Sequence, residues 1–117
     1  PDKLPDLFSK AGTLILPSSE YEHWGVVCHE ANSAGLPVIC SNLCGSSDEL
    51  VQHNVNGYIV PPKDAHSLAE AMKKIASSSE EKLWQLSKKS YQISLGYSPQ
   101  IWVQTLLSAY KNYKTYY

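Results

Sequence analysis

Short apolar runs alternate with helical patterns in the first half of the chain. Residues 13–17 (TLILP) and 37–41 (PVICS) predict two buried strands of a parallel sheet, the first covered on both faces. Between them, small and apolar residues recur every three or four positions from residue 25 or 26 to 34, and a glycine and a proline stop the pattern. We therefore expect a strand, a crossover helix and a second, parallel strand.

The flanking segments predict further elements of the same layered fold. A short helix over residues 4–11 precedes the first strand, and a polar loop leads into another short helix within residues 45–53. Asn56 and Gly57 form a turn signal before a third short strand at 58–60. These elements place a small parallel sheet in the first half of the chain.

Three helices are predicted in the second half. Asp64 should cap a helix over 65–77, a second helix covers 80–95, and Pro99 starts a last helix that reaches about residue 113. The apolar positions that recur at helical spacing are Leu68, Ala69, Met72 and Ile75 in the first, Leu83, Trp84, Leu86, Tyr91 and Leu95 in the second, and Trp102, Leu106, Ala109 and Tyr113 in the third.

Composition narrows the classes of protein. A chain of 117 residues predicts one domain, small for an enzyme that must hold both a donor and an acceptor. All ten basic residues are lysines and the formal net charge is −1, so no basic excess indicates nucleic acid binding. The three cysteines contain no C-x-x-C pair, which predicts reduced thiols and a cytoplasmic protein. No run approaches the roughly 18 apolar residues of a membrane span, so we expect a soluble or peripheral protein.

Two glutamates, Glu22 and Glu30, stand eight positions apart around the start of the crossover helix. Ligands of parallel sheets collect beyond the carboxyl ends of the strands, where residues 18–25 should lie. The first helical N–H groups, at residues 24–27, and the positive end of the helix dipole suit a phosphate or diphosphate. A carboxylate can accept hydrogen bonds from two neighbouring hydroxyls, such as a ribose diol. The pattern predicts a site for a charged, hydroxyl-rich ligand.

The residues around these glutamates resemble a known family. The run E-H-W-G-V-V-C-H-E-A-N-S-A-G-L-P-V-I is similar to the Glu-x7-Glu signature of retaining glycosyltransferases with the GT-B fold, especially family 4, with Trp24 in place of the common Phe. The resemblance covers roughly residues 4–76. The loop before the signature is one residue longer than is usual in the family, so Glu20 is an alternative to Glu22, although the seven-residue spacing favours Glu22. The positions in register are Glu22, Gly25, Glu30, Ala31, Gly35, Pro37, Val38 and Ile39.

The resemblance implies a fold and a domain organisation. It implies an α/β fold with a Rossmann-like parallel sheet flanked by helices, in which residues 1–117 form part of the C-terminal nucleotide-sugar-binding domain of a GT-B enzyme. Residues 99–117 would be the C-terminal helix that crosses back onto an N-terminal acceptor domain. The family's domain normally begins with further strands and an Arg/Lys pair that contacts phosphate, so we expect this chain to be a fragment that is inactive alone.

The resemblance also implies roles for individual residues in transfer with retention. Glu22, as the catalytic residue, would hold hydroxyls of the transferred sugar, and Glu30 would bind the ribose diol. The N–H groups around Gly25, Val26 and Val27 would bind the sugar or the diphosphate. The donor would be a UDP-sugar, and no metal or other cofactor is expected, because the chain has no D-x-D motif and no pair of histidines at metal-ligand spacing.

Two neighbouring side chains and a rival function remain open at this point. His23 lies in the sugar-facing loop and could contact the donor, whereas Trp24 could pack in the core or form a shelf beside the donor sugar. The acceptors of the family are often lipid-linked, and a hexosyl- or N-acetylhexosaminyltransferase of bacterial surface polysaccharide (O-antigen or capsule) synthesis is the expected enzyme. The alternative is a non-catalytic nucleotide-binding or regulatory α/β module.

Overall fold

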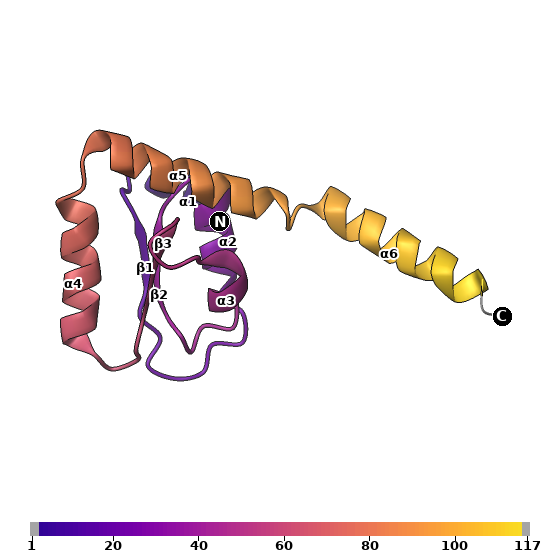
Figure 1. Ribbon diagram of the computed structural model, residues 1–117, viewed down its shortest axis with the longest axis horizontal. Coiled ribbons are helices and arrows are strands. Elements are labelled where there is room, and N and C mark those ends of the chain that lie inside the picture. The colour runs from indigo at the N-terminus through magenta and orange to yellow at the C-terminus, as the bar shows by residue number, and fades with distance from the viewer. Residues whose placement is uncertain (1–2, 116–117) are drawn as a thin grey trace.

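The computed structural model describes residues 3–115, which fold around a three-stranded parallel sheet (Figure 1). Strand β2 (Val38–Ser41) lies between β1 (Leu14–Leu16) and β3 (Gly57–Val60), and both neighbours run parallel to it. The strands, their parallel direction and the α/β class are therefore as predicted. Each strand is one or two residues longer or shorter than its sequence pattern indicated.

The three strands differ in burial. All four residues of β2 are buried, as predicted, but the three residues of β1 are only half-buried. The expectation that the first strand is covered on both faces is therefore wrong for this structure. Strand β1 pairs only with β2 among the residues described.

Helices cover both faces of the sheet (Figure 1). Helix α4 (Ala65–Ala76) packs on one face, with Ile39 of β2, and α2 (Val26–Ser33) packs on the other, with Val38. This division follows from the pleat, since successive side chains of a strand point to opposite faces. The remaining helices are α1 (Leu4–Phe8), α3 (Ser47–Leu50), α5 (Glu80–Leu95) and α6 (Pro99–Thr115).

The predicted helix starts are mostly correct, and one cap is visible in detail. The Asp64 carboxylate accepts a hydrogen bond from the backbone N–H of Ser67 at 3.0 Å and another from the Ser67 hydroxyl at 2.6 Å. An acidic side chain at this position satisfies an N–H group that has no partner within the helix, which explains why α4 begins at Ala65. The prediction of Asp64 as a helix cap is confirmed.

The predicted inward stripes of the helices need correction. In α4 the buried residues are Ala71 and Ile75, whereas Met72 is 44 % exposed. In α5 the buried residues include Ser90 and Ser94, while three of the predicted apolar positions, Trp84, Tyr91 and Leu95, are at least half exposed. Helix α5 packs against α2, and its buried positions include small serines that a search for apolar residues misses.

Helix α6 projects away from the rest of the domain (Figure 1). Its predicted stripe of apolar positions is solvent-exposed, and Trp102 is 66 % exposed. The helix itself agrees with the sequence pattern, extending from Pro99 to Thr115. Its expected crossing onto an N-terminal domain stays a prediction.

Candidate functional site

Two loops meet at the carboxyl ends of β1 and β2. The backbone of Glu22, in the loop after β1, pairs in parallel with that of Cys44, in the loop after β2. The Glu22 N–H donates to the Leu43 carbonyl at 3.0 Å, and the Gly45 N–H donates to the Glu22 carbonyl at 2.8 Å. The Ser46 N–H donates to the Trp24 carbonyl at 3.0 Å, which ties the loops together up to the start of α2.

Gly25 makes this close contact between the loops possible. It caps the N-terminus of α2 with a left-handed backbone (φ 80°) that L side chains rarely adopt. A Cβ atom at this position would lie 2.6 Å from the Cys44 sulfur and 3.1 Å from Cδ2 of Leu16. The Cys44 thiol donates to the Trp24 carbonyl at 3.2 Å, so the sulfur is held where it excludes any side chain at Gly25.

The beginning of α2 is open to solvent. Val26, the first helical residue, is 61 % exposed, and Glu22, His23 and Trp24 in the preceding loop are exposed as well. The first N–H groups of a helix have no carbonyl partner within it, and together with the helix dipole they carry a partial positive charge. No acidic residue of the helix's own first turn neutralises that charge. The site can therefore receive an anionic group from solvent.

Glu22 lies beside the start of α2, and Glu30 lies about one turn further along the helix. The Cγ atom of Glu22 is 3.6 Å from the position of a Cβ on Gly25, so its side chain lies beside the helix start. Glu30 follows Val26 by four residues, which places both on one face of the helix about 6 Å apart along its axis. Glu30 is exposed and lines a groove with Leu4 and other residues of the segment that contains α1.

The neighbouring side chains of the signature occupy different environments. The exposed His23 ring packs edge-on against Tyr21, with ring centroids 5.4 Å apart. Trp24 is 37 % exposed, so it lies at the surface of the domain. Glu20 is also exposed, but the pairing with Cys44 and the contact with Gly25 both involve Glu22. Val27 is half-buried in the first turn of α2.

The three cysteines form a buried group beneath the site. Cys28, Cys40 and Cys44 are all free thiols, as predicted. A hydrogen bond with Cys40, together with burial, raises the pKa of Cys28, and burial raises the pKa of Cys44. At neutral pH the Cys28 and Cys44 thiols are therefore protonated and act as packing groups. Sequence patterns gave no sign that Cys44 touches Gly25, because the two residues belong to different loops.

Within residues 3–115, no group of three or more His, Cys, Asp or Glu side chains is arranged to hold a metal ion. None of the helices in this range combines the length and apolarity needed to cross a bilayer.

The relatives of the chain identify its family. Residues 1–93 match the family model described as Glycosyl transferases group 1. This chain belongs to that family. An uncharacterized glycosyltransferase of Methanocaldococcus jannaschii is 38 % identical over 76 residues, which cover 65 % of this chain and 19 % of that protein. The chain spans less than a third of the length of the curated relatives it matches.

Solved structures of glycosyltransferases share the fold. A glycosyltransferase from Rickettsia africae superimposes with a TM-score of 0.82 at 21 % identity, over 92 % of this chain and 28 % of that chain. Anabaena HepE, solved in complex with UDP, has a TM-score of 0.77 at 25 % identity, over 92 % of this chain and 30 % of its own. The predicted Rossmann-like fold, as found in the C-terminal domain of GT-B glycosyltransferases, is confirmed.

Proposed function

We propose that this chain binds the donor of a retaining family 4 glycosyltransferase, a nucleotide diphosphate sugar. The observation that carries the proposal is the open N-terminus of α2, which has Glu22 beside its first turn and Glu30 one turn further along. Membership of the glycosyltransferase group 1 family supports the same reading. Together they favour transfer of a sugar over a purely regulatory role.

The order of the groups along α2 matches the order of the groups in such a donor. Glu30 would accept hydrogen bonds from the ribose diol, and the N–H groups at Gly25, Val26 and Val27 would bind the diphosphate. Glu22 would then hold hydroxyls of the transferred sugar, with His23 and Trp24 close by in the same loop. A donor laid along the helix start in this direction meets a suitable partner at its ribose, its diphosphate and its sugar.

We propose a UDP-sugar that carries a hexose or an N-acetylhexosamine, bound without a metal or other cofactor. Anabaena HepE, 25 % identical over most of this chain, was solved with UDP, which supports this choice of nucleotide. In the reaction, the N–H groups and helix dipole would stabilise the departing diphosphate while Glu22 orients the oxocarbenium-like sugar. Glu22 would act by position and charge, not as a nucleophile.

The acceptor is proposed to come from outside this chain. A separate N-terminal domain would hold it, and a lipid-linked saccharide of bacterial O-antigen or capsule synthesis, extended at the cytoplasmic face of the membrane, is our proposed acceptor. An assay of transfer from radiolabelled UDP-sugars to extracted lipid-linked saccharides by the protein that contains this chain tests this proposal. Exclusive transfer to a soluble protein or small molecule would contradict it.

The binding roles can be tested with UDP and UDP-sugars in calorimetric titrations of the protein that contains this chain. Glu30→Gln should weaken the binding of both UDP and UDP-sugars, because losing a charge-assisted hydrogen bond costs about 1.5–3 kcal/mol, or roughly 10- to 150-fold in affinity. Glu22→Gln should weaken the binding of UDP-sugars but leave the affinity for UDP unchanged. Glu20→Gln and Glu81→Gln, an exposed glutamate at the start of α5, are matched controls. Unchanged UDP affinity in Glu30→Gln would refute the ribose role.

A further inference from the structure

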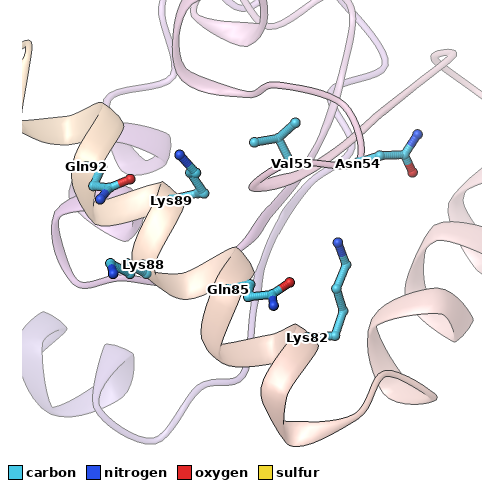
Figure 2. Close-up of a pocket in the computed structure, with 7 residues that line it drawn as sticks. All are labelled: Asn54, Val55, Lys82, Gln85, Lys88, Lys89 and Gln92. Carbon is cyan, nitrogen blue, oxygen red and sulfur yellow. The ribbon is translucent and has the colours of Figure 1, made fainter.

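A second concave region lies far along the sheet from the donor site. It is a groove of about 390 Å³ between α5 and the turn that contains Asn54 and Val55 (Figure 2). This turn precedes β3, whereas the loops of the donor site follow β1 and β2. Because the strands are parallel, the groove lies at the amino ends of the strands and the donor site lies at their carboxyl ends. The groove is therefore no part of the site described above.

One wall of the groove is a polar stripe of α5. Lys82, Gln85, Lys89 and Gln92 are spaced by three, four and three residues, which places them along one side of the helix (Figure 2). Lys88 flanks the stripe. The stripe borders the buried face of α5 that carries Leu86, Ser90 and Ser94.

The other wall is held rigidly by the buried side chain of Asn56. The Asn56 amide donates to the Leu50 carbonyl at 3.0 Å, and its oxygen accepts from the Gln52 N–H at 2.7 Å. The Ser90 hydroxyl of α5 donates to the Asn56 carbonyl at 3.3 Å. This last bond ties the helix to the turn, so the two walls keep their relative positions and the groove is preformed. Preformed sites bind at a lower entropic cost.

The groove is positively charged in a chain of net charge −1. Lys82, Lys88 and Lys89 form no ion pair with any side chain in the described part of the chain, and no acidic side chain there lines the groove. Lys82 and Lys89 are about 10 Å apart along the helix axis. A ligand with negative groups spaced along its length can contact more of these lysines than a single anion can.

We propose that this groove binds an acidic oligosaccharide. Carboxylate or phosphate groups on the sugar chain would pair with Lys82 and Lys89, and its hydroxyls would bond to the side-chain amides of Gln85, Gln92 and Asn54. The groove has no aromatic lining residue on which bases could stack, which disfavours single-stranded nucleic acid. Its concave shape disfavours a flat bilayer. This site is separate from the donor site, because it would hold a charged glycan at the amino ends of the strands.

Calorimetric titration of the protein that contains this chain tests the proposal. We expect tetragalacturonate, or a phosphorylated mannose oligosaccharide, to bind much more tightly than monomeric galacturonate, and neutral maltotetraose not to bind. The preferred acidic probe identifies whether carboxylate or phosphate is the recognised group. Raised salt concentration should weaken binding, and UDP should not displace the oligosaccharide.

Variants with matched charge changes complete the test. Lys82→Gln combined with Lys89→Gln should weaken binding of the acidic oligosaccharide at least tenfold, whereas Lys73→Gln combined with Lys74→Gln, on α4, should leave it unchanged. The proposal is overturned if neither acidic oligosaccharide binds at millimolar concentration, if both double variants lose the same affinity, or if UDP competes. Tighter binding of anionic vesicles or single-stranded RNA, with the same dependence on Lys82 and Lys89, would also overturn it.

Discussion

Replacing Gly25 with alanine should destabilise the whole domain through two separate effects. The backbone at this position is left-handed (φ 80°), a conformation that costs an L residue roughly 1–2 kcal/mol. The added methyl group would also lie 2.6 Å from the Cys44 sulfur, and overpacking of this kind typically costs about 1–3 kcal/mol. The two costs add to roughly 2–5 kcal/mol, a large part of the ~5–15 kcal/mol that stabilises a typical domain.

Urea unfolding followed by far-ultraviolet circular dichroism measures this loss. The midpoint should fall without a large change in slope, and the melting temperature should drop by at least about 8 °C. Gly12→Ala is the matched control, because no atom lies within 4 Å of a Cβ there and the backbone is not left-handed. That variant should be neutral or slightly more stable than the parent.

A double-mutant cycle with Cys44→Ala separates the clash from the backbone strain. Removing the sulfur leaves space for the new methyl group, so the double variant should be more stable than the sum of the single changes by about 0.5–3 kcal/mol. The backbone cost of roughly 1–2 kcal/mol would persist in the double variant. Additivity within about 0.5 kcal/mol, or a Gly25→Ala variant as stable as the parent, would refute the reasoning.

Three further outcomes follow from other contacts. Asn56→Ala should lower the free energy of unfolding by about 2–4 kcal/mol in urea titrations, because it removes the hydrogen bonds that this fully buried side chain makes with Leu50, Gln52 and Asn32. A loss below about 1 kcal/mol would argue against the network. Hydrogen bonds from Ser67 lower the pKa of Asp64 below its ordinary value of 3.8. The stability that this carboxylate contributes is present above pH 3.8 and should be lost as the pH falls through the lower pKa of the folded state. Asp64→Asn should flatten this loss of stability in acid titrations. In the native protein the three buried cysteines should resist iodoacetamide at neutral pH, whereas in urea they should react, and mass spectrometry can follow the labelling. Rapid labelling of Cys44 in the native protein would contradict its burial.

The pattern of short apolar runs and punctuating residues predicted most of the elements. Asp64 and Pro99 marked the starts of α4 and α6 because capping and proline effects act within a few residues. The position of Glu22 before the crossover helix was likewise predictable, since the carboxyl ends of parallel strands gather on one edge of the sheet. These features depend on local backbone chemistry, which a single sequence expresses directly.

Features that depend on packing partners were harder to predict. Met72 lies at helical spacing with the buried Ile75, and Trp84 recurs with other apolar positions of α5. The structure exposes both side chains, because another face of each helix packs on the domain. The role of Ser90 was missed because a small hydroxyl side chain at a helix contact looks like any exposed serine in the sequence. Periodicity identifies a helix, but the position of its neighbours decides which side is buried.

The sequence by itself determined the kinds of element, their order and the location of the two glutamates around one helix start, since each depends on residues close together in the chain. Only the tertiary structure decided that Cys44 presses against Gly25 and that Lys82 and Lys89 face the turn at Asn54. These pairs are separated by 19 to 35 residues in the chain, and their contact depends on how strands and helices pack around the buried side chains between them. Packing of this kind is a property of the assembled core and is absent from any short segment.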